Sequence, residues 1–365
     1  MAVTKVTPAG LSLTQIGKNL FHNGDFAVWQ RGDVSGLGTA AKYTADGVKY
    51  ASVTGSEAGR LTVEKSTTVP AGSGHKQSLK VDITTPDSSI AAGEGYYFEL
   101  PLEARNCSHL DYGAATAKSL CISFWTRSST TGNYQFMLEA PDGSRAYSTT
   151  YNIASADTWE KKKIVIAGDS SGTINNDAGA GLILRFSLTL GSNFQGGTQN
   201  AWATTANNMY AAGSTLNLLS STSNDWYIAG LLVEEGDEVT DFPFEDFGTS
   251  FARCARYFYR LVDGNNLAMP NLQQNSTTGG WAFLHFPVEM MESPTIQYSS
   301  LSHFAIDLVG STVDPSAIVR YNQSHVSTYL NAQWSSAGSD GDALRWYTDS
   351  SDATFDITAE LWRRT

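Results

Sequence analysis

The sequence predicts an all-β protein in which a large β-sandwich is followed by a short helix and a second, smaller β-sandwich. Short apolar segments recur along the 365 residues, and Gly, Ser, Thr, Asn and Asp separate them. The composition includes 33 Gly, 16 Phe, 16 Tyr and 9 Trp but only 16% charged residues, which is typical of strands joined by many turns. At one place, near residue 249, the apolar period changes from that of a strand to that of a helix.

The chain is long enough for two domains with separate cores. We expect an N-terminal segment at 1–18, a large sandwich at 19–247, a linker helix at 248–260 and a C-terminal sandwich at 261–365. The first segment is polar and too short to fold alone. Two alternatives stay open for it: a disordered tail, or an attachment segment that becomes ordered against a neighbouring protein.

The first domain is expected to contain a series of short strands. Residues 182–190 place Leu, Leu, Phe, Leu and Leu at alternate positions, which predicts a strand that is buried on one face. Residues 226–233 are apolar almost without interruption, which predicts a strand that is covered on both faces. The remaining expected strands are 19–31, 47–53, 60–65, 77–83, 95–100, 120–127, 133–140, 149–153 and 160–166.

The joint between the domains begins with the acidic turn 234–246. The helix that follows is predicted from Phe251, Cys254, Ala255 and Phe258, which have helical spacing. Its opposite side carries three arginines, Arg253, Arg256 and Arg260. We expect these arginines to pair with acids of the preceding turn or with a neighbouring subunit.

The second domain is predicted to be a sandwich of about 105 residues. Its last strand is the clearest, because the residues at 355, 357, 359 and 361 are apolar and those between them are polar. The other expected strands are 279–288, 295–300, 303–308, 317–321, 326–333 and 343–348. A repeat of 20 to 50 residues is not apparent, which argues against a shaft of stacked β-coils.

Composition and charge exclude several classes of function. A net charge of −12 argues against binding to nucleic acid, which a basic surface would normally drive. There is no run of 18 apolar residues, so we expect no membrane insertion. The first 25 residues lack the basic start and apolar core of a signal peptide, so we expect synthesis in a cytosol. The three cysteines have no Cys-x-x-Cys pair and are expected to be free thiols.

Residues suited to catalysis are scarce. Glu234, Glu235, Asp237, Glu238 and Asp241 follow one another in a strand-ending turn, where such acids are far more often solvated than paired as in a glycosidase. The six histidines are scattered singly, without the spacing of a metal site or a Ser-His-Asp arrangement. We therefore expect no catalytic residues and no enzyme.

Two separated motifs carry a resemblance to a known family. The first is NLFHNGDFAVWQRGD at 19–33. The second comprises Gly230, Leu231, Glu234, Gly236, Thr240, Phe242, Glu245, Cys254, Arg256, Tyr257 and Tyr259. Together they resemble the segments that open and close a carbohydrate-binding-module-like jelly roll in bacteriophage tail-fibre and virion-appendage proteins. The resemblance implies that the first domain is a jelly roll and that the chain belongs to a homotrimeric tail fibre or head fibre.

The same resemblance implies a site for sugar. Modules of this type bind sugars on aromatic rings, and the candidates in loop-like contexts are Trp202, Tyr210, Tyr96 and Tyr97. The long polar segment 191–224 contains two of them. Trp202 has two open interpretations: a ring that holds this segment to its own domain, or an exposed platform for a sugar or a partner protein.

Many such modules also hold one structural calcium. The positions that usually supply its carboxylates are here Ala27 and Ala229. Asp25 or Asp225 could substitute for them, so they are weak calcium candidates. No other cofactor is expected.

The function expected from these observations is that of a non-enzymatic virion protein, made in the host bacterial cytoplasm. It would project from a phage particle and bind other virion proteins and host-surface polysaccharide. One alternative is a capsid or tail decoration protein that binds only other virion proteins. A further alternative is a polysaccharide depolymerase, against which the missing repeat and the missing acid pair argue.

Overall fold

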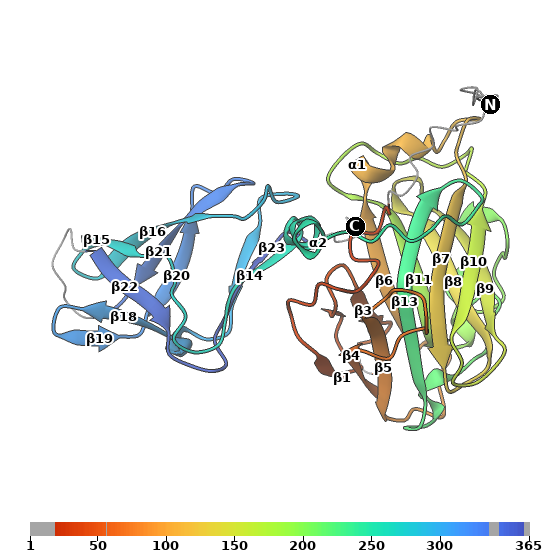
Figure 1. Cartoon of the computed structure of the whole chain (residues 1–365), viewed down its shortest axis with the longest axis horizontal. Helices are drawn as coiled ribbons and strands as arrows, with labels where there is room; N and C mark the ends of the chain where they lie inside the picture. Colours follow the sequence, from red (N-terminus) through yellow and green to blue (C-terminus); the bar gives the residue numbers. More distant parts are fainter. Residues whose placement is uncertain (1–18, 56, 336–342, 361–365) are drawn as a thin grey trace, which may run out of the picture. The chain divides into compact units, whose positions relative to one another are not determined.

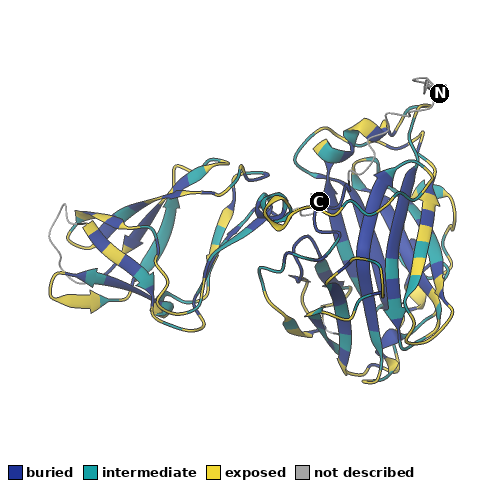
Figure 2. Ribbon diagram, in the orientation of Figure 1, coloured by how far each residue is buried: buried dark blue, intermediate teal, exposed yellow. Residues whose placement is uncertain are grey.

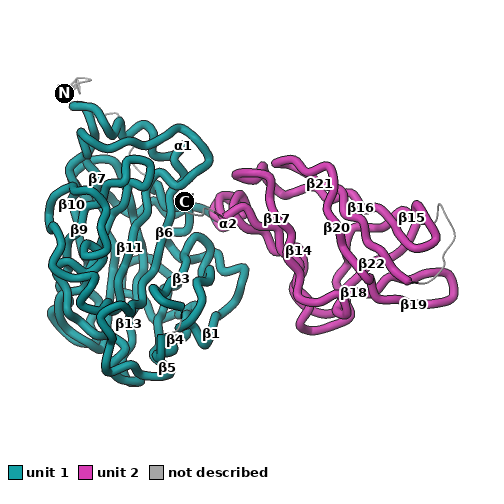
Figure 3. The backbone as a smooth tube through the Cα atoms, turned by 180° about the vertical axis from the view of Figure 1, so that it is seen from behind, with its two compact units in different colours: residues 1–246, 362–365 teal, residues 247–361 magenta. Residues whose placement is uncertain are grey.

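The computed structural model describes residues 19–55, 57–335 and 343–360. The chain divides into two compact units, with the boundary between Asp246 and Phe247 (Figure 3). Each unit is built of β-sheets, which confirms the predicted all-β class. The expected N-terminal segment 1–18 lies outside the described residues.

The first unit contains two sheets of antiparallel strands (Figure 1). One sheet has the strand order β1-β4-β5-β13-β7-β10, and the other has the order β12-β9-β8-β11-β6-β3-β2. The strands are β1 (Val34–Leu37), β2 (Lys42–Tyr43), β3 (Lys49–Ser52), β4 (Arg60–Ser66), β5 (Ser78–Thr85), β6 (Gly95–Glu103), β7 (Leu120–Ser128), β8 (Gly132–Ala140), β9 (Arg145–Ile153), β10 (Glu160–Ile166), β11 (Ala180–Leu190), β12 (Trp202–Thr204) and β13 (Asp225–Glu235). The short helices are α1 (Ala104–Cys107), η2 (Ser108–Leu110), η3 (Pro141–Gly143), η4 (Ser192–Phe194), η5 (Asn207–Met209) and η6 (Leu218–Ser220).

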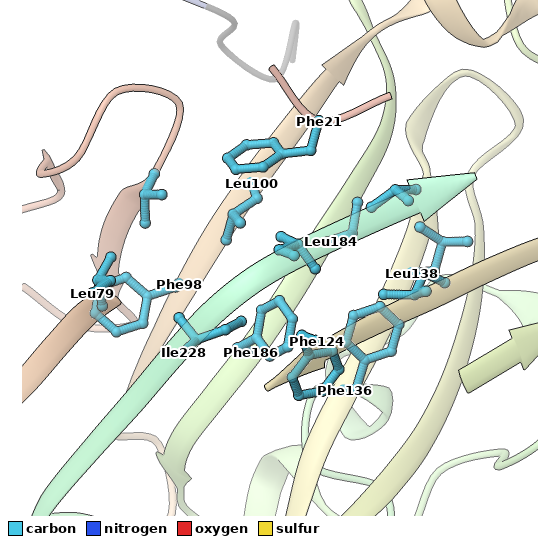
Figure 4. Close-up of a cluster of buried hydrophobic side chains, with 14 of the residues drawn as sticks. Phe21, Leu79, Phe98, Leu100, Phe124, Phe136, Leu138, Leu184, Phe186 and Ile228 are labelled. Atoms are coloured by element: carbon cyan, nitrogen blue, oxygen red, sulfur yellow. The ribbon is translucent and has the colours of Figure 1, made fainter. Parts of the chain in front are cut away.

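Aromatic side chains pack between these two sheets and form the core of the first unit (Figure 4). The ring of Trp226 on β13 lies 6.3 Å from Phe98 on β6 and 6.0 Å from Phe186 on β11, measured between centroids. Phe124 on β7 meets Phe186 edge-on at 5.3 Å. The central strands β7, β11 and β13 are accordingly buried along most of their length (dark blue in Figure 2). The first unit is therefore a β-sandwich.

Residues 19–31 were expected to form the first strand, and this prediction is wrong. The segment is irregular and attaches to β13 through side chains as well as backbone. The Asn19 amide donates to the Leu231 carbonyl at 2.7 Å, and its oxygen accepts from the Val233 amide at 3.0 Å. Strand β13 has an irregular register between Ala229 and Leu232, so regular pairing is interrupted where the segment meets it.

The second unit also contains two antiparallel sheets. Their strand orders are β14-β23-β17 and β19-β18-β22-β15-β16-β21-β20. The elements are α2 (Phe247–Ala255), β14 (Phe258–Asp263), β15 (Leu272–Ser276), β16 (Gly279–His285), β17 (Thr295–Tyr298), η7 (Leu301–His303), β18 (Phe304–Leu308), β19 (Ser311–Val313), β20 (Ala317–Tyr321), β21 (Ser327–Gln333), β22 (Ala343–Thr348) and β23 (Thr354–Thr358). Phe355 on β23 lies 6.1 Å from Phe304 on β18 and 6.3 Å from Trp346 on β22, so the core of this unit joins its two sheets.

The linker helix is shorter than the predicted 248–260. It ends at Ala255, because residues from Phe258 onward pair with β23. Arg260 is the register partner of Asp356 and binds its carboxylate through two hydrogen bonds, at 2.8 and 2.9 Å. Arg260 thus has a partner within the second unit, and the expected pairing of the three arginines with the 234–246 turn or a neighbouring subunit stays a prediction. Arg256 donates to the backbone oxygen of Glu289 at 3.1 Å.

Within the described ranges, none of the helices has the length and apolar character needed to cross a membrane. The three cysteines are buried free thiols, as predicted.

Candidate functional site

The middle of the long segment 191–224, around residues 207–214, is fastened to the outer face of the second sheet of the first unit. Elsewhere in the segment, β12 extends the same sheet as an edge strand, and Leu218 and Leu219 are buried in the core between the sheets. The Ser187 hydroxyl of β11 donates to the Tyr210 carbonyl at 2.8 Å. The Ser148 hydroxyl of β9 donates to the Met209 carbonyl at 2.6 Å. The Gly213 amide in turn donates to the Gln135 side chain of β8 at 2.8 Å. The segment thus covers a face of the sheet that the sequence had predicted to be open.

A buried ion cluster lies beneath this cover. Arg185 of β11 donates to Glu99 through Nε at 3.0 Å and through Nη2 at 2.8 Å, and also pairs with Glu139. Lys49 lies 3.3 Å from Glu99. Burial raises the pKa of Glu99, but the charges of Arg185 and Lys49 outweigh it and hold the pKa below its ordinary value. The Glu99 carboxylate is therefore held as a structural anion.

Because of this covering segment, the burial of β11 differs from the prediction. The alternation of leucines predicted burial on one face only, but every residue from Ala180 to Leu190 is buried. The second face carries Arg185, Ser187 and Thr189, which look solvent-exposed in sequence. They are buried because a segment that follows β11 in the chain folds back over them.

Trp202 holds the covering segment to its own domain. Its indole N–H donates to the Ala167 carbonyl at 2.7 Å. Its ring lies edge-on to Tyr112 at 5.6 Å and to Tyr147 at 5.8 Å. The side chain is half-buried. Of its two interpretations, these contacts favour the ring that holds the segment in place.

The three tyrosines proposed from the sequence are engaged in the same way. Tyr96 is fully buried, with its hydroxyl bonded to Asp87 at 2.8 Å, so it has no surface on which a sugar could stack. Tyr97 and Tyr210 are half-buried and contact each other at 5.7 Å. Tyr210 also lies under Arg185, whose Cζ is 4.9 Å from its ring centroid. The prediction that Tyr96 binds sugar is therefore wrong, because strand alternation places its side chain in the core.

The two calcium candidates lie apart and have protein partners. The Asp25 carboxylate lies 2.5 Å from Nδ1 of His75. The Asp225 carboxylate accepts from the Ser129 amide at 3.0 Å and lies 3.7 Å from Arg127. Asp25 meets β13 near Leu231, six residues or roughly 20 Å of strand from Asp225. A cluster of three or more His, Cys, Asp or Glu side chains suited to a metal does not occur in the described part of the chain.

The acidic turn was expected to be solvated, but several of its members have local partners and Glu234 is buried. Glu234 accepts from the Thr240 amide at 2.9 Å and from the Thr240 hydroxyl at 2.7 Å. Glu235 pairs with Lys118 at 3.1 Å, and Glu238 pairs with Lys163 at 2.9 Å.

An open aromatic surface occurs in the second unit instead. Strands β16, β21 and β20 are neighbours in the larger sheet (Figure 1). Their outward side chains form what we call the aromatic face, which consists of Trp281, Phe283, Tyr321 and Tyr329. Phe283, Tyr321 and Tyr329 are 47%, 44% and 41% exposed. Trp281 lies 4.9 Å from Tyr321, and Phe283 lies 5.0 Å from Tyr329.

A hollow adjoins the Trp281 end of the aromatic face. It has a volume of about 350 Å³, and we call it the amide pocket. Its lining includes Asn275, Thr278, Trp281, Asn331, Gln333 and Trp334, and the lining that the structure describes carries no charged side chain. The Asn275 carboxamide, in the orientation that satisfies both of its ends, accepts from the Trp281 indole and donates to the Gly279 carbonyl at 2.9 Å.

Trp334 borders the pocket, but its ring lies on the buried side of the sheet. The side chain is 2% exposed, and its indole nitrogen has no hydrogen-bond partner among the described residues. The ring packs closely on Gly280, where an added Cβ would come within 3.3 Å of it. The indole nitrogen is therefore on the side of the sheet opposite the exposed rings, out of reach of a ligand in the pocket.

The sequence predicted the strand at 279–288 but not its open face. Both sides of this strand are apolar or aromatic, so the pattern looks like a strand covered on both sides. One side carries Gly280, Ala282 and Leu284, and the other carries Trp281, Phe283 and His285. The signal that could have identified the site is that one side carries only large rings and the other only small or aliphatic residues. The structure buries the aliphatic side and leaves the aromatic side open.

Comparisons with known proteins give similarity of architecture only. No protein-family model matches the chain. No curated protein sequence matches it. Among solved structures, the enzymatically active domain of tailspike protein 4 from bacteriophage CBA120 is 12% identical, with a TM-score of 0.30, over 52% of this chain and 20% of that one. The matched part of the chain thus spans one fifth of that tailspike.

Two carbohydrate-binding structures are also similar. The tandem domain CBM22-1-CBM22-2 of Xyn10C from Paenibacillus barcinonensis is 11% identical over 96% of this chain and all of that one, with a TM-score of 0.30. The family 11 carbohydrate-binding module from Clostridium thermocellum is 14% identical over 58% of this chain and 99% of that one, with a TM-score of 0.28. At these values the similarity assigns neither a family nor a site to the chain.

Proposed function

We propose that the chain is a non-enzymatic, glycan-binding component of a phage tail fibre or head fibre, and that its aromatic face holds host-surface polysaccharide. The observation that carries the proposal is the row of four neighbouring rings on an open sheet face. A pyranose ring presents a mostly C–H surface, and aromatic side chains stack on such a surface.

The surroundings of the rings favour a sugar over a purely apolar partner. Gln273, Asn275 and Gln333 are exposed, and they share the outward side of the sheet with the aromatic face. Carboxamides offer both donors and acceptors, as the hydroxyl groups of a sugar require. A face that alternates rings with amides is thus suited to a ligand that is apolar on one side and polar around its edge.

The virion assignment rests on the resemblance of the two sequence motifs to those of phage appendages. Asn19 belongs to the first motif and Leu231 to the second, and a hydrogen bond of 2.7 Å joins them. The proposal includes a homotrimer on the particle. Several shallow sites on one particle would act together, so that weak binding at each site adds up to firm attachment.

The proposal of a non-enzymatic role is supported by the state of the carboxylates. The described lining of the amide pocket contains none, so a sugar placed there would meet no general acid or base. Glu99 and Glu139 are both engaged with Arg185 beneath the covering segment. An assay for reducing ends released from polysaccharide tests this part directly, and release above that of a boiled control would contradict it.

Binding is tested with the full chain on an array of printed neutral and acidic glycans. The double variant Phe283→Ala, Tyr329→Ala should weaken binding by at least tenfold, because it removes two of the four rings on which a sugar would stack. A tenfold change in affinity corresponds to about 1.4 kcal/mol of binding free energy. Val309→Ser is the matched control, since Val309 is an exposed apolar residue of the same unit, outside the aromatic face. Unchanged binding by the double variant would overturn the proposed site.

The location is tested by immunogold labelling of particles from the host that produces the chain. Label on a tail or head fibre supports the proposal, and absence of label from intact particles contradicts it. A variant that lacks glycan binding but still assembles on the particle would separate the proposal from the decoration-protein alternative.

A further inference from the structure

We infer that the amide pocket is a subsite for one uncharged sugar residue, and that it gives the aromatic face a preference for neutral glycans over acidic ones. This inference rests on the proposed glycan-binding function and names the class of ligand at that site.

The size of the pocket suits a single sugar unit together with its hydroxyl groups. Small-molecule sites typically have volumes of about 300–1,000 Å³, and this pocket, at about 350 Å³, lies at the lower end of that range. A pocket of this size that opens beside Trp281 can hold one sugar unit while the rest of the glycan lies on the aromatic face.

The pocket offers amides in place of charges. The Gln333 carboxamide donates to Asn331 at 3.1 Å, which orients it, and Asn331 in turn donates to the Gly280 carbonyl at 3.1 Å. A carboxylate moved from water into this lining would lose its hydration without gaining a cation, which is unfavourable. A neutral sugar has no such cost.

The nearest cationic side chain on these strands does not alter this balance. Arg320 is the register partner of Leu330, which pairs with Ala282 on the buried side of the sheet. Its guanidinium thus belongs to the face opposite the rings. His285 is on the aromatic side, but it lies two alternating positions beyond Trp281, at the far end of β16.

The pocket and the rings are placed so that one glycan can reach both. Trp281 and Phe283 are two residues apart on β16, a separation of about 7 Å along the strand. Trp281 borders the pocket, and Phe283 continues the ring surface away from it. A sugar in the pocket and the next sugars on the rings would therefore belong to a single chain.

The test measures binding of the full chain to neutral oligosaccharides, such as maltoheptaose, cellohexaose and mannan fragments, and to acidic oligouronates of similar length. Wild-type protein should bind at least one neutral series more than tenfold tighter than any oligouronate. Gln333→Ala and Asn275→Ala should each weaken neutral binding by about threefold to tenfold, because each variant removes a carboxamide from the pocket lining. Gln333→Lys should raise affinity for oligouronates.

The matched control is Gln297→Ala, an exposed glutamine on β17 of the other sheet, which should bind as wild type does. Gln333 and Asn275 are both exposed, so both pocket variants should fold. Tighter wild-type binding to oligouronates, or neutral binding unchanged in both pocket variants, overturns the inference. If the pocket variants bind normally while the Phe283→Ala, Tyr329→Ala double variant does not, only the inference fails. Failure to bind any glycan at millimolar concentration overturns the proposed function as well.

Discussion

Phe283 and Tyr329 are register partners on β16 and β21, and their rings lie 5.0 Å apart while both side chains remain more than two-fifths exposed. Large rings in contact with each other and with solvent bury little of their apolar area. Contiguous exposed apolar surface of this kind marks interaction sites on proteins. The pair should therefore matter more for binding than for folding.

We expect Phe283→Ala and Tyr329→Ala each to lower the free energy of unfolding by less than about 1 kcal/mol, because a cross-strand pair contributes only about 0.2–1 kcal/mol. Urea unfolding followed by circular dichroism measures this. A loss above about 3 kcal/mol would show that the rings belong to the core, because that is the cost of truncating a buried aromatic residue.

Arg185→Met should destabilise the first unit by about 3–5 kcal/mol, because it leaves Glu99 and Glu139 buried without their shared cation. Arg345→Met is the control, since Arg345 pairs with Asp307 at the surface, and it should have no measurable effect. Thermal unfolding of both variants gives the comparison. Equal melting temperatures would contradict the structural role of the cluster.

The stability of the first unit should fall in acid partly through Glu99. The pKa of Glu99 is lower in the folded protein than in the unfolded chain, where it is about 4.3, so this contribution is present above that pH. It is lost as pH falls through the folded-state pKa. Unfolding free energies between pH 2 and 6 should decline less steeply for Glu99→Gln than for wild type, and parallel declines would refute the assignment.

Trp202→Ala should loosen the covering segment without affecting glycan binding. Removing a half-buried ring should cost about 2 kcal/mol, roughly half of the 3–5 kcal/mol for a fully buried one. Amide hydrogen exchange should accelerate in residues 191–224. Trp202→Phe is the matched control, because it keeps the ring contacts and loses only the bond to Ala167. Loss of binding with an unchanged melting temperature would restore Trp202 as a binding residue.

The thiols should be unreactive in the folded protein. Burial raises the pKa of Cys121 to about 11, and Cys107 and Cys254 are also buried. A disulfide reagent at pH 8 should therefore modify none of the three within minutes, but all three in guanidinium chloride. Rapid modification of one thiol in native protein would show that a cysteine is accessible.

Sequence by itself predicted the strands where a strong local pattern is present. Phe355 and Ile357 alternate with polar residues, and β23 forms there. The apolar run from 226 to 233 became β13, which is buried on both faces as expected. Such patterns are reliable because side chains of a strand alternate with period two, a property of the local backbone. The short strands β1, β2 and β12 lack this pattern and were not predicted.

The tertiary structure alone decided which strand faces are covered. The Arg185 side of β11 looks exposed in sequence and is buried, whereas the Trp281 side of β16 looks buried and is open. Tertiary pairing also ends helix α2 at Ala255, because β14 pairs with β23, nearly a hundred residues further along the chain. Periodicity separates the two faces of a strand, but burial depends on what packs against each face. That partner comes from a remote segment, so no local pattern could have revealed it.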